Sequence, residues 1–438
     1  MQFPSFDSSP TFRLFTVLAF AVALAVPIAL VWLVVEVRFE YEQEVSAEIS
    51  RGWGDEQVII GPFLRLKVRP PASAMADVST GDDQIQSYFF TPRSWSVKSV
   101  AQHEERKKGI FKKPVYVSTI VVEGSFNNDL TAFAGRRNVD IANIEGCSIQ
   151  LALSYSQIIR SLDGQFGGRE LDFEPSSQRL GWHGEPIQAE LNSSECSGGT
   201  FQLSLVARGS NRHSIAMVGD ESTLAMDASW PHPSFEGRQL PDSYNVASTG
   251  FKADWTSNAL ARGFASELDE NEWLAITDES VVGFSFHEPS SLYRMVTRAV
   301  KYGFFVVGLT LLSIFCLEMV TSAKIHVIQY AIVGAALALF YLLLLSFAEH
   351  IGFVASYIVA SVVLISLIVG YAWVSTHEKK FVGSLAALLF SVYAALYICL
   401  ASTDYALLIG SLLLVILIAG LMYATRNMVV DSNQLDER

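Results

Sequence analysis

The sequence lacks the short motifs that identify the common hydrolases and nucleotide-binding enzymes. It contains no G-x-S-x-G, no glycine-rich phosphate loop, no H-E-x-x-H and no S-x-x-K. A serine nucleophile on a tight turn, a phosphate cradle or a paired-histidine zinc site is therefore not indicated. We expect a protein that is not an enzyme, with no catalytic, cofactor-binding or metal-binding residues and no cofactor.

Positive charge is scarce as well. The 438 residues include 31 Lys and Arg against 44 Asp and Glu, which gives a formal net charge of -13. Because nucleic-acid partners require a basic surface, this balance argues against one. The strongest basic cluster surrounds Gly109 and consists of Arg106, Lys107, Lys108, Lys112 and Lys113. We interpret it as a solvated hairpin tip before a strand at Val115, in preference to a contact with anionic lipid or envelope polymers.

Cysteine and histidine are few and are not clustered. The four cysteines follow no metal or redox spacing. Cys316 and Cys399 lie in apolar stretches and are expected to be small buried hydrophobes. Cys147 and Cys196 could pair in an oxidising compartment, but 49 positions separate them and nothing else indicates a bond, so unpaired thiols are preferred. The histidines of the middle region, which we interpret as surface or structural residues, are His103, His183, His213, His232 and His287.

Long hydrophobic segments are abundant and very unevenly placed. About 20 apolar residues in a helix cross a hydrocarbon core of about 30 Å. The first such segment is Leu14–Val35, which we interpret as an uncleaved anchor and not a signal peptide, because it continues past Ala25 and contains Pro27. Five more follow: Tyr302–Val320, His326–Ala348, Ile351–Trp373, Phe381–Ala401 and Tyr405–Ala424.

The short loops between these spans predict their orientation. Lys and Arg concentrate on the cytoplasmic side of a membrane. If the N-terminus is cytoplasmic, every short cytoplasmic segment carries positive charge, and the opposite breaks at Glu349, His350 and Asp404 carry none; the positive residues are Arg13, Lys324, Lys379, Lys380, Arg426 and Arg438. Residues 1–13 and 425–438 are then cytoplasmic. Residues 36–301 face the periplasm of a bacterial inner membrane.

The middle region has the pattern of an antiparallel β domain. A helix is expected to continue from Glu36 to about Trp53, and no long amphipathic helix follows before about residue 290. Strands are predicted at Val115–Val122, Ser148–Tyr155, Phe201–Ala207 and Thr223–Trp230. Turns are predicted at Asp163–Gly168, Gly181–Glu185, Ser197–Gly199 and Arg208–Arg212. The fold class is a membrane α+β protein: an anchor helix at 14–35, a sandwich-like domain at 36–301, in one or two subdomains, and a five-helix bundle at 302–424.

Small residues recur every four positions in two of the spans. Such stripes let helix backbones approach closely, so we expect both to lie at helix contacts. They are Gly352, Ser356 and Ala360 in the fourth span, and Gly383, Ala387, Ser391 and Ala395 in the fifth.

The most unusual soluble segment is Ser229–Phe235, with the sequence S-W-P-H-P-S-F. Its two prolines fix φ on either side of His232, which excludes a helix or a central strand. We expect a rigid loop with Trp230, His232, Pro233 and Phe235 as candidate interaction residues. A binding surface and a plug that closes the corner of a sandwich are equally compatible with this pattern.

Ionisable residues at membrane depth are the other candidate site. Glu318 lies near the cytoplasmic end of the second span, where Lys324 or His326 could reach it. Glu349 and His350 lie at the opposite membrane face, in what reads as a very tight turn. Because no intermediate acid connects Glu318 with Glu349, a proton-driven pump is not favoured. The competing interpretation is that these four polar residues only pair for structure or mark the membrane surface.

Several of these segments resemble the CreD family of bacterial inner-membrane proteins. The matching residues cover nearly the whole chain: Gly61-Pro62, Ile110-Phe111, Pro114-Val115-Tyr116, Ser229–Phe235, Gly237, Leu240-Pro241, Gly250-Phe251, Trp255, Thr297-Arg298-Ala299, Lys301-Tyr302, Glu318, His326, Gln329-Tyr330, Val333-Gly334, Phe340–Leu345, Glu349-His350 and Gly352-Phe353. Leu317-Glu318 stands where the family pattern has Phe-Glu. The resemblance implies a role in cell-envelope integrity, within a two-component regulon connected with the β-lactam response. It supplies no catalytic residues.

Together these features predict a non-enzymatic inner-membrane protein that supports envelope integrity or the envelope stress response, with a periplasmic binding or sensing domain. Its expected partners are the lipid bilayer and an envelope protein or cell-wall component. The alternative is a transporter or lipid-handling protein that uses the C-terminal bundle. That alternative requires an internal polar path, and the spans offer mainly Ser, Thr and Tyr besides Glu318. The sequence does not indicate an oligomeric state.

Overall fold

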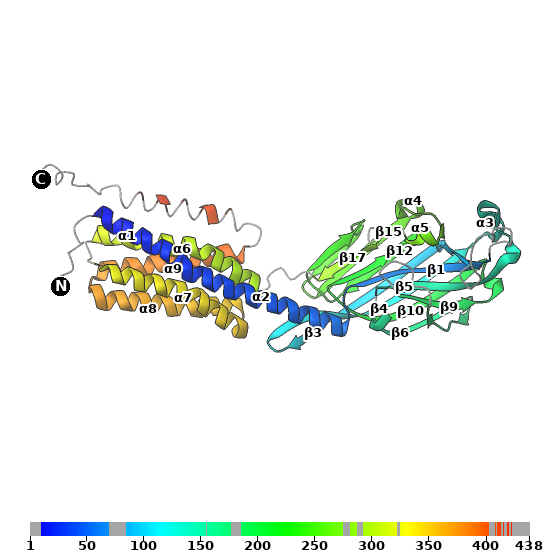
Figure 1. Cartoon of the computed structure of the whole chain (residues 1–438), viewed down its shortest axis with the longest axis horizontal. Coiled ribbons are helices and arrows are strands. Elements are labelled where there is room, and N and C mark those ends of the chain that lie inside the picture. The colour runs from blue at the N-terminus through cyan, green and yellow to red at the C-terminus, as the bar shows by residue number, and fades with distance from the viewer. Residues whose placement is uncertain are drawn as a thin grey trace, which may run out of the picture. The chain divides into compact units, whose positions relative to one another are not determined.

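The computed structural model describes residues 10–69, 85–154, 156–176, 185–274, 281–286, 292–321 and 325–402, with single residues between 408 and 422. The chain divides into two compact units (Figure 1). We call residues 1–43 with 290–438 the helical unit, and residues 44–289 the β unit.

The helical unit contains six helices in the part of the chain that the structure describes. They are α1 (Pro10–Ala23), α2 (Ala25–Trp53), α6 (Leu292–Thr321), α7 (Val327–Ile351), α8 (Phe353–Thr376) and α9 (Lys379–Ala401), of which α2 continues into the β unit. Within the described residues, five helices are long and apolar enough to cross a membrane, and the first of these runs from Leu18 to Trp53. The predicted continuation of this helix to Trp53 is therefore confirmed. The sixth predicted span, Tyr405–Ala424, lies largely outside the described residues.

The helices α6, α7, α8 and α9 pack as neighbours, and α1 lies against α6 and α7. Ser356 and Ala360 of α8 are buried, as expected for a stripe of small residues at a helix contact, but Gly352 of the same predicted stripe is exposed and precedes the helix. The matching expectation for α9 is wrong, because Gly383, Ala387 and Ser391 are exposed. The buried face of α9 carries large residues instead, among them Phe381, Leu385, Leu389 and Tyr393.

The break between α7 and α8 also differs from the prediction. Glu349 and His350 belong to the last turn of α7, and the chain reverses at Gly352, whose φ is 78°. A left-handed φ favours glycine because a Cβ would clash with the backbone. The turn is therefore set by the glycine and not by the two polar residues before it.

The β unit consists of two sheets (Figure 1). The first, sheet A, has nine described strands in the order β13 (Pro233–Gly237), β17 (Val281–Phe286), β11 (Arg212–Ala216), β1 (Gln57–Val68), β5 (Ile144–Leu153), β9 (Glu185–Leu191) and β8 (Glu174–Pro175), with β2 (Gln86–Phe90) on β1 and β16 (Glu267–Asp269) on β2. The second, sheet B, has eight in the order β14 (Ser243–Ala247), β15 (Gly250–Asn258), β12 (Glu221–Ala228), β3 (Ser94–Lys108), β4 (Phe111–Asn127), β10 (Gly198–Ser210), β6 (Ile159–Phe166) and β7 (Arg169–Glu170).

Most strand pairs are antiparallel; β1 with β11 and β12 with β3 are parallel. Short helical pieces connect the strands: α3 (Leu130–Arg137), α4 (Ala259–Arg262), α5 (Glu270–Leu274), η3 (Ile141–Asn143), η4 (Ser156–Ile158) and η5 (Ser193–Glu195). No long helix lies between residue 58 and residue 286 among the described residues, in agreement with the sequence.

The two sheets enclose a single hydrophobic core, so the β unit is one sandwich and not two. Side chains alternate along the strands, and β12 and β15 show a strict buried–exposed period of two. Several hydrogen bonds cross between the sheets, and three of them lie inside this core between buried residues. Trp95 Nε1 donates to the carbonyl of Gly61 (3.2 Å), Ser118 Oγ donates to Gln57 Oε1 (2.9 Å), and Ser99 Oγ lies 2.7 Å from His213 Nε2.

A disulfide between Cys147 and Cys196 also joins the sheets, which corrects the preference for unpaired thiols. Cys147 lies in β5 of sheet A, and Cys196 lies just before β10 of sheet B. Both residues are buried. Their 49-residue separation gave no sign that the folded sheets bring them together.

Two predicted turns are shorter than expected. Strand β6 continues through most of Asp163–Gly168 and ends at Phe166. Only Asn211, with φ of 58°, separates β10 from β11 where a turn at Arg208–Arg212 was predicted. The predicted turn at Gly181–Glu185 lies mostly outside the described residues.

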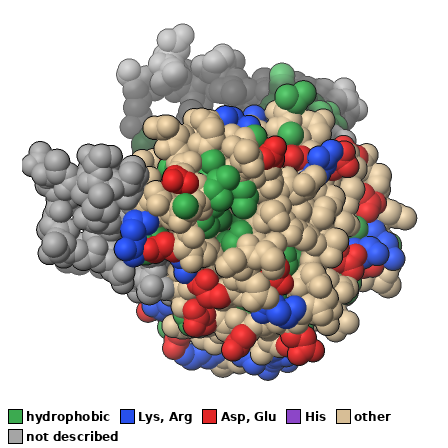
Figure 2. Space-filling model, turned by 90° about the vertical axis from the view of Figure 1, so that its right-hand side faces the viewer, with side chains coloured by type: hydrophobic (Ala, Val, Ile, Leu, Met, Phe, Trp, Pro, Cys, Tyr) green, Lys and Arg blue, Asp and Glu red, His purple; other side chains and the backbone are tan. Residues whose placement is uncertain are grey.

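The basic cluster lies on the β3–β4 hairpin, as predicted. Lys108 pairs with Phe111, which leaves Gly109 and Ile110 as the tip. Nearby carboxylates neutralise part of its charge through the ion pairs Arg106–Glu104, Lys112–Glu105 and Lys108–Glu48. Figure 2 shows acidic and basic side chains interspersed on another face of the β unit, around a small hydrophobic patch. Neither the hairpin nor that face presents a broad positive surface.

Candidate functional site

Trp230 lies at a corner of the sandwich where both sheets contribute side chains. Its ring packs 5.3 Å from Phe286 of β17 and 5.5 Å from His103 of β3. Its indole N–H donates to the carbonyl of His232 at 2.9 Å. Ser229 Oγ accepts the backbone N–H of His103 (2.9 Å) and lies 2.8 Å from His103 Nδ1. We call His103, Trp230 and His232 the aromatic corner.

The aromatic corner is rigid and accessible to solvent. Trp230 is half-buried, whereas His103 and His232 are exposed. Pro231 and Pro233 fix φ on both sides of His232, and the indole hydrogen bond closes the loop. A partner that binds here would therefore order few additional side chains, which lowers the entropic cost of binding.

The contacts of Phe235 fit the corner-plug interpretation of this segment. The segment is not a loop throughout, because β13 begins at Pro233 and pairs with β17 at the edge of sheet A. Proline is tolerated at position 233 because, on an edge strand, the N–H groups that point away from the sheet make no hydrogen bond to another strand. The ring of Phe235 packs against Tyr244, Phe251 and Trp255 at 5.4 to 6.0 Å. Phe235 thus closes the corner, and Trp230 with His232 faces solvent.

Sequence reasoning did not connect His103 or Phe286 with this corner. Strand β3 is more than 100 positions away from Trp230 in the sequence, and only the sheet arrangement brings them together. His103 was visible in the sequence only as an isolated histidine.

Glu318 is buried among the helices of the helical unit. Tyr330 of α7 donates its hydroxyl to Glu318 Oε2 at 2.5 Å, and the backbone N–H of Ile325 donates to Oε1 at 3.2 Å. His326 caps the start of α7: its Nδ1 accepts the N–H of Ile328, and its own N–H donates to Gln329 Oε1. These bonds fasten the connection between α6 and α7. Lys324, the other predicted partner of Glu318, lies outside the described residues.

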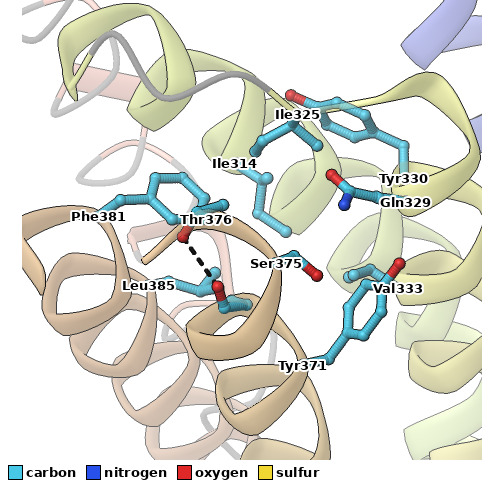
Figure 3. Close-up of a pocket in the computed structure, with 11 residues that line it drawn as sticks. Ile314, Ile325, Gln329, Tyr330, Val333, Tyr371, Ser375, Thr376, Phe381 and Leu385 are labelled. Carbon is cyan, nitrogen blue, oxygen red and sulfur yellow. Dashed lines mark hydrogen bonds between the residues drawn. The ribbon is translucent and has the colours of Figure 1, made fainter. Parts of the chain in front are cut away.

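A small cavity lies beside this connection (Figure 3). Gln329, Tyr371 and Ser375 contribute polar groups to its lining, and Ile314, Phe381 and other apolar residues complete it. Its volume is about 30 Å³, which is enough for one or two water molecules. A cavity of this size is too small for a lipid molecule.

Glu349 joins three helices at the other end of α7. It accepts a hydrogen bond from the Tyr293 hydroxyl of α6 at 3.0 Å and lies 3.8 Å from Arg38 Nε of α2. Its side chain is 12% exposed, whereas His350 is exposed. The four polar residues predicted in the membrane region therefore separate into two pairs. Glu318 near the end of α6 and His326 at the start of α7 form one, and Glu349 with His350 in the last turn of α7 form the other.

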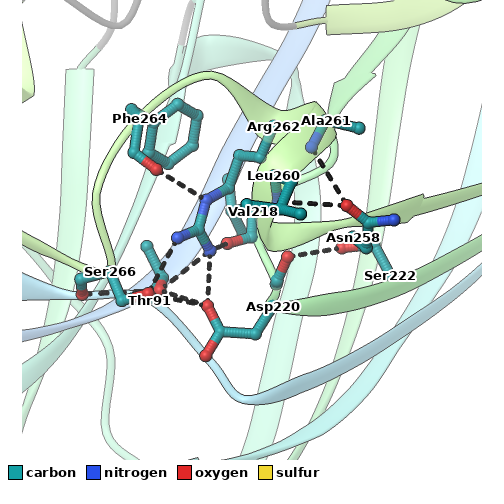
Figure 4. A network of polar contacts seen from close by, with 11 residues as sticks. Thr91, Val218, Asp220, Ser222, Asn258, Leu260, Ala261, Arg262, Phe264 and Ser266 are labelled. Carbon is teal, nitrogen blue, oxygen red and sulfur yellow. Dashed lines mark hydrogen bonds and ion pairs between the residues drawn. The ribbon is translucent and has the colours of Figure 1, made fainter.

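A buried arginine that the sequence analysis missed organises the loop after β15 (Figure 4). The guanidinium of Arg262 donates to Asp220 Oδ1 (2.9 Å), to the Val218 carbonyl (2.8 Å), to Thr91 Oγ1 (3.0 Å) and to Ser266 Oγ (2.9 Å). Burial lowers the pKa of Arg262, and the charge of Asp220 opposes that effect. These bonds fasten the loop after β15 to the residues just before β12 and to the end of β2, and the bond to Ser266 lies within the loop.

The histidines form no metal site in the part of the chain that the structure describes, where no three His, Cys, Asp or Glu side chains cluster. His213 is fully buried, and burial lowers its pKa to about 3. It is therefore neutral at physiological pH and bonds Ser99 through Nε2. His183 and His287 lie outside the described residues.

Comparison with known proteins places these features in a family. Residues 9–430 match the family model described as Inner membrane protein CreD. The chain belongs to the CreD family. It is 30% identical to the inner membrane protein CreD of Escherichia coli strain K12, over 96% of this chain and 93% of that protein.

Membership of the CreD family establishes the class of protein. The chain is an inner-membrane protein with transmembrane helices and a large β unit between the first of these helices and the rest. The resemblance first seen in the separate motifs thus extends over nearly the whole chain.

Proposed function

We propose that this CreD-family protein supports the integrity of the bacterial cell envelope without catalysing a reaction. In this proposal the β unit faces the periplasm, both termini are cytoplasmic, and the helices anchor the protein in the inner membrane. The β unit binds or senses an envelope protein or a cell-wall component.

The disulfide is the main structural support for the periplasmic location. Disulfides persist in oxidising compartments and are rare in the cytosol. The Cys147–Cys196 bond is buried and connects the two sheets. It is therefore part of the folded structure of the β unit. The distribution of Lys and Arg in the short loops supports the same orientation independently.

The aromatic corner is the proposed contact surface. Trp is enriched where protein partners bind because its large ring contributes area at little conformational cost. The corner presents such a ring beside two exposed imidazoles and holds it in place through its hydrogen bond and prolines. We assign Phe235 a supporting role in the corner, because it is partly buried and packs against three other aromatic rings.

The test is the double variant Trp230→Ala with His232→Ala, expressed in cells that lack the native protein. We expect a normal amount in the inner membrane and a protease-resistant β unit, but loss of the envelope phenotype, measured as survival under a β-lactam and detergent. The matched control is Ile141→Ala with Leu260→Ala, which removes two exposed apolar side chains elsewhere on the same unit. If the Trp230–His232 variant keeps the full phenotype at a normal membrane level, the corner is not the contact surface.

A further inference from the structure

Strand β14 is an open edge of sheet B. It pairs with β15 on one side, and sheet B ends there on the other. All five of its residues, Ser243–Ala247, are exposed. An edge of this kind presents unpaired N–H and C=O groups to which another strand can bind.

The exposed residues of β14 include side chains that belong to the inner face of the sheet. Tyr244 pairs with Ala253 and Val246 pairs with Phe251, and paired residues share a face. Ala253 and Phe251 are buried in the core, yet Tyr244 is 65% exposed and Val246 is 43% exposed. The apolar layer between the sheets therefore continues past the last strand and meets solvent.

The other edge strands among those described carry features that discourage pairing. Strands β7 and β8 are only two residues long and include Glu170 and Glu174, while β16 has two acids in three residues. Strand β13 begins with Pro233. Charge, proline and short length are the means by which proteins protect sheet edges. In contrast, Ser243–Gly250 contains no charge and no proline.

We propose that β14 is a dimer interface, where it pairs antiparallel with β14 of a second copy of this chain. Pairing centred on Asn245 places Tyr244 opposite Val246 of the second copy on the inner face, and Ser243 opposite Ala247. Asp242 then faces Ser248, so no like charges meet. A charged partner peptide would find no complementary charge along this strand, whereas a second copy matches it residue by residue.

Confinement to one membrane increases how often two copies meet. Copies of an inner-membrane protein share one bilayer and one orientation, so their β units meet on the same side. Such confinement raises the effective concentration of the second copy without any additional contact. Trp230 and His232 take no part in β14, whereas Phe235, which closes the corner, packs against Tyr244 of β14.

The test is cysteine cross-linking of the full-length protein in inner-membrane vesicles. In the proposed pairing, the two Asn245 Cα atoms lie about 5 Å apart, which is within disulfide range. Lys252 of β15 is the matched control, because it is exposed and pairs with Asn245 within one copy. Two Lys252 residues would lie three strand spacings apart, about 14 Å, which is too far for a bond.

We expect Asn245→Cys to form a disulfide-linked dimer on mild oxidation, at least tenfold more than Lys252→Cys. Adding Tyr244→Lys with Val246→Lys should reduce the Asn245→Cys dimer at least tenfold, while the protein stays folded by protease resistance. Absence of the dimer overturns the proposal. So do equal yields at the two positions, which indicate random collision, and a cross-link from Asn245→Cys to a different polypeptide, which assigns the edge to another partner.

Discussion

The strongest stability prediction concerns the disulfide between the two sheets. Replacing Cys147 and Cys196 by Ala removes a cross-link that closes a loop of 49 residues in the unfolded chain. In the chain-entropy description, closing a loop of that length contributes about 4 kcal/mol at 25 °C, and native disulfides typically contribute about 2–4 kcal/mol. We therefore expect the double variant to lower the free energy of unfolding of the β unit by about 2–4 kcal/mol.

Urea unfolding of the full-length protein in detergent, followed by brief proteolysis at each urea concentration, measures this change for the β unit. Cys316→Ala is the matched control, because Cys316 is a buried free cysteine in α6 and its loss should leave the midpoint of the β unit unchanged. Thiol labelling after denaturation without reductant should detect two reactive cysteines in the natural protein. Four reactive thiols in protein from the inner membrane, or an unchanged midpoint in the double variant, would refute the reasoning and remove the main support for a periplasmic β unit.

Four further predictions concern buried polar groups. Arg262→Met should destabilise the β unit by about 1.5–3 kcal/mol in the same urea assay, because it removes charged hydrogen bonds to Asp220, Thr91 and the Val218 carbonyl. An unchanged urea midpoint would show that the network is dispensable. His213 binds a proton in the unfolded chain below about pH 6.5 but in the folded protein only near pH 3. The free energy of unfolding should therefore fall as the pH drops from about 6.5 to about 3, and His213→Gln should make it less dependent on pH in this range. Tyr330→Phe should destabilise the helical unit by about 1.5–3 kcal/mol, seen as a lower melting temperature in detergent, because it removes a hydrogen bond to a carboxylate. Glu318→Gln should leave the envelope phenotype intact at a normal protein level; loss of the phenotype would revive ion coupling through this acid.

The sequence predicted the elements whose formation depends on local patterns. Apolar segments longer than about 18 residues have no other stable place than a bilayer or a large core, so the first helix and α6 to α9 could be identified directly. A run of β-branched residues predicted β4, and period-two alternation predicted β5, β10 and β12. The glycine at position 109 predicted the hairpin tip. The basic cluster could be assigned to a solvated hairpin tip because its residues flank that glycine in the sequence.

The candidate sites were predicted less well because they depend on distant contacts. Trp230 and His232 could be singled out by the two prolines around them, but their packing against His103 and Phe286 depends on which strands become neighbours. Phe235 looked identical in kind to Trp230 in the sequence, yet it lies on an edge strand against three rings. The stripe of small residues on α9 was predicted to lie at a helix contact. The buried face of α9 carries larger side chains instead.

By itself, the sequence determined the membrane location, the division into helical and β parts, and the family, because hydrophobic length, strand alternation and motif identity are all local. Tertiary structure alone decided that the β part is one sandwich, that Cys147 meets Cys196, that Arg262 fastens a loop to Asp220, and that β14 is left as an uncharged open edge. Each of these depends on which strands lie side by side. That arrangement is set by the burial of the whole core and by chain connectivity, which no short stretch of sequence records.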